Sequence, residues 1–290
     1  MTRRKAVIFG TPGSWHCEKL ARALKKRRIQ PTFASINAVC AQLGNRLEVT
    51  FEDEPLSLFD LAFVREVPGG SLEQVIFRMD ALHQLENGGM RIINSPYAIE
   101  KMVDKYYTLS LLQKAGLPVP ETRVLESAEA ALAAFHELGG DVVVKPLFGS
   151  RGVGMVRVTD DDTAGRVFRA MQIGDFVYYL QKFIPHDNRD IRVLVAGGEC
   201  IAAMERVARD WKTNVAAGAH PEPYEPEEDV RTASLLAVQA VGADYCGVDL
   251  LRSESGELFL LEVNSMPAWE GLQTVTQFDI ADRIVEKCLV

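Results

Sequence analysis

The chain has 290 residues, of which 47% are hydrophobic and 25% are charged. These fractions match folded globular proteins and exclude a disordered or collagen-like chain, and the length predicts roughly two compact units of about 150 residues each. The net charge of −8 argues against a general nucleic-acid binder and favours small ligands. No apolar run approaches the roughly 18 residues of a membrane helix, and the first ten residues lack a signal-peptide core. We therefore expect a cytoplasmic protein that binds neither membranes nor nucleic acid.

Short apolar strands alternate with helical patterns over residues 1–95. The predicted strands are Lys5–Phe9, Pro31–Ile36, Leu61–Val64 and Arg91–Ile93, and the predicted helices are Cys17–Arg28 and Ser71–Glu86. This alternation predicts a Rossmann-like α/β domain with a parallel sheet. The turn at Gly10–Gly13 lacks the full dinucleotide fingerprint, so a plain tight turn is favoured over a phosphate loop.

A second unit is predicted over residues 96–180 and a third over 181–290. Asn94-Ser95-Pro96 signals the start of a helix that extends to Ala115, and the stiff connector Leu117–Pro120 follows it. Strands and helices then alternate in an α+β pattern. The predicted elements are a helix capped by Ser127, strands at Asp141–Pro146, Met155–Val158 and Phe176–Phe183, and a helix at Thr163–Met171. Two antiparallel hairpins, Ile191–Arg206 and Cys246–Asn264, dominate the last third.

The second hairpin carries Asp249, Glu262 and Asn264. With a four-residue loop at Ser253–Gly256, Leu260 lies opposite Asp249, so Glu262 becomes its diagonal neighbour on the face that Asn264 shares. Carboxylates among apolar residues are costly to bury unpaired, and Mg²⁺ prefers oxygen ligands. The pattern favours a magnesium site. The alternative is that the carboxylates pair with nearby arginines or lie on a solvated face.

Two further patterns indicate anion binding. Lys145 ends an apolar strand and precedes the glycine-rich loop Gly149–Gly154, which resembles a phosphate flap, although a flexible hairpin explains it equally well. In the first hairpin, a Gly197-Gly198 turn puts Ala196 opposite Glu199 and Arg189 opposite Arg206. Like charges so placed repel one another unless an anion lies between them. Basic residues surround this hairpin, and solvated exposure is the alternative for each taken singly: Arg189, Arg192, Arg206, Arg209 and Lys212.

These residues, in this order, resemble the ATP-grasp superfamily, and within it the RimK-type α-L-glutamate ligases. The matching stretches run from Asn94 to Ala281 and are Asn94–Lys105, Val142–Gly154, Gln181–Ile184, Arg189–Arg192, Glu205-Arg206, Thr213-Asn214, Gly247–Arg252 and Glu262–Asn264. The resemblance implies an ATP-grasp fold, which is two α+β lobes that hold ATP between them, behind the α/β domain. It also implies a homo-oligomer.

The resemblance implies a role for each matching residue. Lys105 and Lys145 contact phosphates, and the lid over them is Gly149, Ser150, Arg151, Gly152, Val153 and Gly154. The adenine pocket is lined by Gln181, Lys182, Phe183 and Ile184, with Asp190 near the ribose. Lys212 and Asn214 lie near the transferred phosphate, and Arg192 and Arg206 at the acyl-phosphate site. Asp249, Glu262 and Asn264 hold Mg²⁺, for which Mn²⁺ can substitute.

The implied reaction is the formation of an amide through an acyl phosphate, with L-glutamate and a small carboxylate-bearing acceptor as partners. Relatives that glutamylate tetrahydromethanopterin suggest a pterin cofactor. A glutamate ligase for a protein C-terminus or carrier protein and a non-catalytic ATP-binding regulatory protein are the alternatives.

The sequence departs from its relatives at two places. Lys182 replaces a common acidic residue, so its adenine contact would rest on the backbone. Ala268-Trp269 replaces a Pro-Gly pair near the substrate, and Trp269 either stacks on a planar acceptor or packs in the interior.

Overall fold

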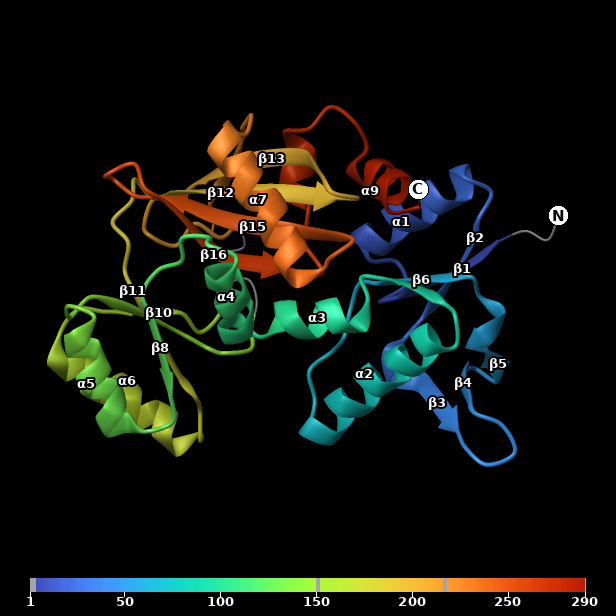
Figure 1. Ribbon diagram of the computed structural model, residues 1–290, viewed down its shortest axis with the longest axis horizontal. Helices are drawn as coiled ribbons and strands as arrows, with labels where there is room; N and C mark the ends of the chain where they lie inside the picture. The colour runs from blue at the N-terminus through green and yellow to red at the C-terminus, as the bar shows by residue number, and fades with distance from the viewer. Residues whose placement is uncertain (1–3, 150–151, 216–217, 290) are drawn as a thin grey trace.

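The computed structural model describes residues 4–149, 152–215 and 218–289. A parallel four-stranded sheet lies at one end of the molecule, an antiparallel four-stranded sheet lies at the other, and a five-stranded sheet lies between them (Figure 1). This arrangement confirms the predicted order of an α/β unit followed by α+β units. The unit boundaries placed after residues 95 and 180 stay predictions.

The parallel sheet has the strand order β2-β1-β6-β7. Its strands are β1 (Lys5–Phe9), β2 (Gln30–Ala34), β6 (Leu61–Val64) and β7 (Arg91–Ile93), and its helices are α1 (Trp15–Lys26) and α2 (Leu72–Asn87). Alternate strand residues point to opposite faces, so Ala6 and Ile8 pack toward α1 while Val7 and Phe9 pack toward α2. Helix α2 begins at Ser71 because Ser71 and Gln74 form a reciprocal capping box.

A small antiparallel sheet between β2 and β6 was missed by the sequence analysis. It consists of β3 (Val39–Gln42), β4 (Glu48–Phe51) and β5 (Glu54–Pro55), and the short helices η1 (Ile36–Ala38) and η2 (Leu56–Leu58) flank it. Val39, Val49 and Leu56 pack into the core on the α2 side of the parallel sheet. The strands are too short and too exposed to show a clear period-2 pattern.

The single helix predicted over residues 96–115 is wrong, because the structure has two helices there. Helix α3 (Pro96–Val103) ends at Asp104, whose extended backbone and side chain begin α4 (Lys105–Lys114). The Asp104 carboxylate accepts a hydrogen bond from the Tyr107 amide at 3.0 Å, which is a typical N-cap. The break places Lys105 in the first turn of a new helix. Both helices pack on the five-stranded sheet.

The antiparallel four-stranded sheet has the order β10-β9-β11-β8. Its strands are β8 (Thr122–Leu125), β9 (Val142–Lys145), β10 (Val156–Val158) and β11 (Tyr178–Lys182), and its helices are α5 (Ala128–Glu137) and α6 (Asp161–Ile173). Both helices cover one face, against which Val142 and Val144 pack. By alternation, Val143 and Lys145 point to the opposite face.

The five-stranded sheet has the order β14-β13-β12-β15-β16. Its strands are β12 (Arg189–Ala196), β13 (Glu199–Val207), β14 (His220–Pro223), β15 (Tyr245–Arg252) and β16 (Leu258–Asn264). Helix α7 (Glu228–Val241) covers one face together with α3 and α4. Strand β14, which the sequence analysis did not predict, is an edge strand that pairs with the end of β13.

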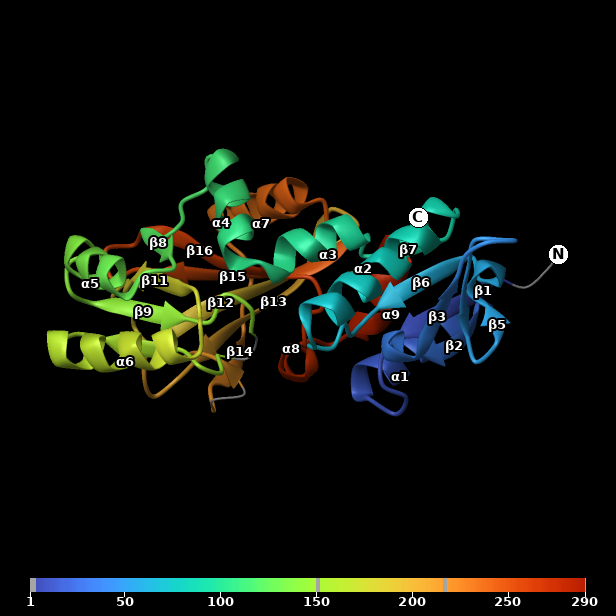
Figure 2. The ribbon, with the colours of Figure 1, turned by 90° about the horizontal axis from the view of Figure 1, so that it is seen from below.

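The C-terminal helices α8 (Glu270–Thr274) and α9 (Ile280–Cys288) return the chain to the first sheet. Helix α9 lies against α1, as Figures 1 and 2 show, and Ile284 and Val285 share a core with Leu20 and Leu24. Arg27 also pairs with Asp282 across this contact. The first and last parts of the chain therefore pack together. Within the described residues, no helix has both the length and the apolar character to cross a membrane.

Asn94 also joins the first sheet to the five-stranded sheet. Its Oδ1 accepts from the amides of Asp244 and Tyr245 at 2.8 and 3.0 Å, and its Nδ2 donates to the carbonyls of Tyr245 and Ser265 at 2.8 and 2.9 Å. The side chain is buried. Asn94, which was expected only as part of a helix-start signal, therefore holds the beginning of β15 and the end of β16 against β7.

We expect Asn94→Ala to lower the free energy of unfolding by about 2–4 kcal/mol, because several buried backbone groups lose their partner at once. Thermal unfolding followed by circular dichroism measures this. The control is Ser95→Ala, since the Ser95 hydroxyl makes one bond, to Glu86 at 3.1 Å. Equal losses for the two variants would contradict the role given to Asn94.

Candidate active site

The register of the second hairpin differs from the prediction. Asp249 lies directly opposite Glu262, whereas Leu260 lies opposite Leu250. Two shifts of one residue explain the difference: the loop has five residues, Ser253–Glu257, and a β-bulge lies between the Asp249 and Leu250 pairs. Each shift reverses the facing of β16, so the two together restore it. The prediction that Asp249, Glu262 and Asn264 share one face therefore survives a wrong register.

Asp249 is held by two arginines. Arg192 lies opposite it on β12 and donates from Nε to Oδ1 at 2.7 Å and from Nη2 to Oδ2 at 2.6 Å. Arg206 Nη2 lies 3.1 Å from Oδ2. Burial opposes ionisation, but the two guanidinium charges outweigh it and lower the pKa of Asp249. Asp249 is thus paired with arginines, which was the alternative to a metal site that the sequence left open. Its Oδ1 accepts only one hydrogen bond and could still accept a second.

The first hairpin corrects the expectation of two facing arginines. Ala196 lies opposite Glu199 as predicted, but a bulge between Leu194 and Val195 shifts the register, so Arg206 lies opposite Asp190. Arg189 faces Val207 instead and pairs with Glu205 at 2.6 Å on the surface. No repulsion between facing arginines exists to be relieved by an anion.

Arg206 and Asp190 form a buried ion pair. Arg206 donates from Nε to Oδ1 at 2.6 Å and from Nη2 to Oδ2 at 2.5 Å, and the Thr213 hydroxyl donates to Oδ2 at 2.6 Å. Each of the two charged side chains is only 3% exposed. Burial raises the pKa of Asp190 although Arg206 opposes the shift. Arg206 therefore bridges two carboxylates, Asp190 and Asp249, in the interior of the sheet.

Glu262 and Asn264 differ from Asp249 because the fold does not pair them. Glu262 has no hydrogen bond or ion pair to any described residue, and burial, followed by the charge of Asp249, raises its pKa, although Lys105, Lys145 and Arg192 oppose the shift. The Nδ2 atom of Asn264 is buried, and it likewise lacks a partner in the described part of the chain. A buried carboxylate without a hydrogen-bond partner, next to a second carboxylate and on the face that Asn264 shares, fits a hard cation such as Mg²⁺, to which Asn264 would offer its amide oxygen. Among the described residues, no cluster of three or more His, Cys, Asp or Glu side chains is suited to a metal. The candidate site has only two side chains of these types, Asp249 and Glu262, and its third residue is an asparagine.

Lys105, at the start of α4, and Lys145, at the end of β9, both interact electrostatically with Glu262, and Lys145 does so with Asp249 as well. Burial lowers the pKa of Lys145 to about 8, Lys105 adds to the shift, and Glu262 and Asp249 oppose it. Burial also lowers the pKa of Lys105, which Glu262 opposes. Lys145 donates to Gln181 Oε1 at 2.6 Å, and Lys105 donates to the Gly149 carbonyl at 2.8 Å. Two lysines and two carboxylates therefore meet between the antiparallel sheets, where partly desolvated cations attract polyphosphate.

The glycine-rich loop approaches the five-stranded sheet through Gly152. Its φ is +72°, and a Cβ at this position would overlap the Asn214 side chain. Only glycine fits this close approach. Gly149 contacts Lys105, whereas Val153 is exposed. Ser150 and Arg151 lie outside the described residues.

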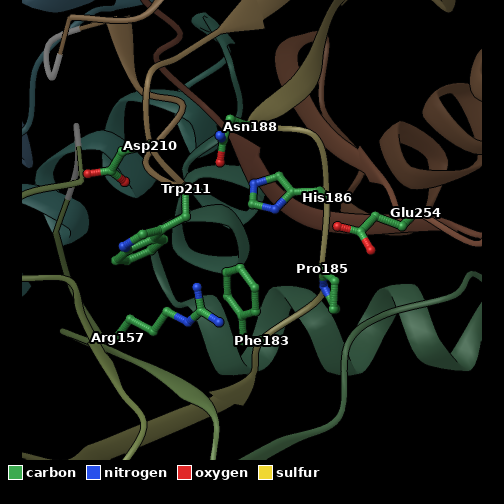
Figure 3. A pocket seen from close by; sticks show the side chains of 8 residues that line it. All are labelled: Arg157, Phe183, Pro185, His186, Asn188, Asp210, Trp211 and Glu254. Atoms are coloured by element: carbon green, nitrogen blue, oxygen red, sulfur yellow. The ribbon is translucent and has the colours of Figure 1, made fainter.

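The four residues expected in an adenine pocket have different surroundings. Gln181 is buried and bonds to Lys145, and Lys182 pairs with Glu121 on the surface at 2.9 Å. Ile184 is half-buried. Phe183 lines a cavity of about 390 Å³, which Figure 3 shows. The cavity is lined by Arg157, Phe183, Pro185, His186, Asn188, Asp210, Trp211 and Glu254.

The sequence analysis missed two residues of this region, Arg157 and Trp211, and gave no role to a third, Thr213, which it named only within a matching stretch. The Arg157 guanidinium lies 3.4 Å from the centre of the Phe183 ring, and the Trp211 ring stands edge-on to Phe183 at 6.3 Å. Thr213 holds Asp190. Trp211 and Thr213 are the sequence neighbours of Lys212, a predicted site residue, and this position could have identified them. Nothing in the sequence marks Arg157. The Lys212 ammonium lies 5.2 Å from the centre of the Trp211 ring, and no described contact joins it to Lys105 or Lys145.

Comparison with known proteins identifies the fold and family. The RimK-like ATP-grasp domain model matches residues 102–288. The chain belongs to the RimK-like ATP-grasp family. The tetrahydromethanopterin:alpha-L-glutamate ligase of Methanococcus maripaludis is 36% identical over 289 residues, which is 97% of each chain. The ligase of the same description from Methanosarcina acetivorans is 30% identical over 98% of each chain. The prediction of an ATP-grasp ligase is confirmed.

Solved structures support the fold over the whole chain. The ATP-grasp ligase PsnB with a minimal precursor superimposes with a TM-score of 0.77 at 20% identity, over 99% of each chain. The RimK domain ATP-grasp protein of Sphaerobacter thermophilus gives 0.78 at 21% identity, over 99% of this chain and 100% of that one. The structural similarity therefore extends to the first α/β sheet, which precedes the matched domain.

Proposed function

We propose that this ATP-grasp ligase joins L-glutamate to the carboxylate of a small acceptor such as a pterin cofactor, with ATP and Mg²⁺. The observation that carries the proposal is the similarity to tetrahydromethanopterin:alpha-L-glutamate ligases over almost the full length of both chains. The site is consistent with this chemistry, because Lys105 and Lys145 both interact electrostatically with the Glu262 carboxylate.

The proposed reaction has two steps. An acceptor carboxylate oxygen attacks the γ-phosphorus of ATP, the bond to the β-γ bridging oxygen breaks, and ADP leaves. The neutral amine of glutamate then attacks the acyl carbon, the carbon–oxygen bond to phosphate breaks, and the amide retains the nitrogen after the loss of a proton. When bound, Mg²⁺ neutralises the negative charge that develops on the phosphates.

We assign the residues as follows. Asp249, Glu262 and Asn264 would hold the metal, and Lys105 and Lys145 the phosphates. The Gly149–Gly154 loop, whose residues Ser150 and Arg151 lie outside the described residues, would close over the phosphates. Asn214, which lies beside Gly152, and Lys212 would lie near the transferred group. Phe183 and its neighbours Gln181, Lys182 and Ile184 receive the adenine. Arg192, which is 14% exposed, would stabilise the acyl phosphate, whereas Asp190 and Arg206, which are paired with one another and each 3% exposed, would hold the sheet in shape.

The decisive experiment measures Mg²⁺-dependent ADP release from ATP and L-glutamate with a panel of acceptors. The panel contains carboxylate-bearing pterins, a deazaflavin cofactor and acidic peptides, and mass spectrometry identifies the product. We expect one glutamyl unit to be added to a pterin. ADP release with a peptide and with no small acceptor would overturn the choice of acceptor.

A carrier protein is the second candidate acceptor. The alpha-aminoadipate–LysW ligase LysX of Sulfurisphaera tokodaii is 32% identical over 70% of this chain. The shorter match makes this acceptor the weaker proposal. Use of Mn²⁺ in place of Mg²⁺ follows from their shared preference for oxygen ligands. The cytoplasmic location and the homo-oligomer stay predictions.

The pKa of Lys145 leads to a prediction for nucleotide binding. Because this pKa is about 8 in the free protein, Lys145 carries its charge below pH 8 and loses it above. Bound phosphates favour the charged form, so ATP affinity should be constant below pH 8 and fall by up to about tenfold per pH unit above it. Without nucleotide, the fold should gain stability between pH 8 and 10.5, because the unfolded chain then binds more protons.

Calorimetric titration of ADP with Mg²⁺ from pH 6.5 to 9.5 tests this dependence. Lys145→Arg is the control, since a guanidinium keeps its charge throughout this range. A wild-type affinity that stays flat to pH 9.5, or a variant that shows the same decline, would assign the titration to another group.

A further inference from the structure

The first sheet has a crevice of the kind in which open α/β sheets bind ligands. From β1 the chain passes to β2 on one side and later to β6 on the other, so the loops after β1 and β6 diverge at the carboxyl edge. The Thr11 hydroxyl, after β1, donates to Glu66, after β6, at 2.8 Å across this point. His16 and Arg65 belong to the same two segments.

Trp269, from the loop after β16, fills this crevice. Its side chain is fully buried. The ring stands edge-on to His16 at 4.5 Å and lies 6.2 Å from the Trp15 ring, and the Arg65 guanidinium lies 4.7 Å from its centre. The Trp269 amide donates to His16 Nε2 at 3.1 Å. Of the two possibilities left open by the sequence, the structure therefore supports packing, and the ring is not exposed for stacking on an acceptor.

Arg65 makes three contacts with the C-terminal part of the chain. Besides the Trp269 ring, it donates from Nη1 to the Tyr245 hydroxyl at 3.1 Å and from Nη2 to the Pro267 carbonyl at 2.9 Å. Tyr245 begins β15, the strand that carries Asp249. A single guanidinium thus contacts both the start of a candidate metal-binding strand and the loop that follows the other strand.

The loop that Arg65 holds is next to the candidate active site. A Cβ on Gly247 would lie 3.0 Å from Pro267 and 3.8 Å from Arg192 Nε, so Pro267 lies against the strand beside Arg192. Gly247 is also the residue opposite Asn264. Further along, Gly271 approaches Val215, which follows Asn214. Residues 265–271, which are the loop after β16 together with the start of α8 and are called the 265–271 loop below, therefore run between the surroundings of Arg192 and those of Asn214.

We propose that Arg65 is a positioning residue for catalysis, which sets the place of the 265–271 loop relative to Arg192 and Asn264. Arg65 lies where an open α/β sheet usually binds a ligand, but here it contacts the 265–271 loop instead. The proposal rests on the proposed function in one respect, that the site between β12 and β16 is where the ligation occurs.

Arg65→Met, which removes the donors and the charge, tests the proposal. We expect kcat for amide formation to fall on the order of 10²-fold, since misplacement by about 1 Å has such effects, while the KM for ATP changes little. Arg65→Lys keeps a cation over the ring and one donor and should restore kcat to within about tenfold of wild type. Hydrogen exchange of the peptide at 265–271 should become faster in Arg65→Met.

Arg27→Met is the matched control. Arg27 also joins the first domain to the C-terminal part, through Asp282 and its carbonyl at 3.0 Å, but it contacts α9 and not the loop. The Arg27→Met substitution should lower the unfolding temperature without changing kcat or the rate of hydrogen exchange at 265–271. Equal kcat in Arg65→Met and wild type, or equal loss in Arg27→Met, would overturn the proposal. If wild type releases no ADP with any acceptor, the proposed function fails, and the exchange comparison alone decides the role of Arg65.

Discussion

Glu262→Gln should abolish ADP formation and leave the fold intact. Removing a residue that only hydrogen-bonds to a metal ligand lowers activity roughly 10–100-fold. Because Glu262 would itself bind the metal, its substitution should lower the rate of ADP formation by more than this. Glu262 has no ion pair among the described residues, and burial and the charge of Asp249 raise its pKa although Lys105, Lys145 and Arg192 oppose the shift. A neutral amide of the same shape should therefore cost the fold little. We therefore expect an unfolding temperature equal to or above that of wild type.

Two measurements distinguish this outcome from misfolding. The rate of ADP release and the affinity for Mn²⁺, followed by its electron paramagnetic resonance signal with ADP, should both fall in Glu262→Gln. Glu257→Gln, on the exposed loop of the same hairpin, should leave both unchanged. Near-normal turnover in Glu262→Gln would remove Glu262 from the metal site.

Arg206→Met should destabilise the protein strongly. Arg206 compensates Asp190 and Asp249, which are 3% and 5% exposed, so its loss leaves two buried carboxylates without this partner. Removing one member of a buried ion pair costs about 3–5 kcal/mol. Activity should fall only as the folded fraction does, because Arg206 acts through the sheet and not on the phosphate. Arg192→Met should show the reverse, with a larger loss of kcat than of stability, since Asp249 keeps Arg206 as a partner.

Arg189→Met is the control for Arg206→Met. It lies on the same hairpin and also pairs with a carboxylate, but the pair is exposed, and such pairs contribute about 0–1 kcal/mol. Thermal unfolding and kcat are measured for all three variants. A stable Arg206→Met protein with a large loss of kcat would return Arg206 to the acyl-phosphate site where the sequence analysis placed it.

The two hairpins show how far strand alternation predicts a site. In the second hairpin, a longer loop and a bulge each move the register by one residue, so their effects on facing cancel and the predicted metal set stays on one face. In the first hairpin a single bulge moves Arg206 from Arg189 to Asp190, and the predicted anion site is replaced by an ion pair. Bulges depend on how neighbouring strands pack, and local sequence does not specify them.

The sequence was sufficient for the order of α/β and α+β units, the family, and the residue types that bind phosphate and metal, because these depend on local periodicity and on motifs in a set order. Only the tertiary structure decided which charges pair. Arg192 and Arg206 meet Asp249, and Glu262 has no ion pair within the described part of the chain. Asn94 and Arg65 contact residues about 150 to 200 positions away in the sequence. Such contacts arise when separate sheets pack together, and charges buried by that packing must be compensated by whichever partners the fold brings near.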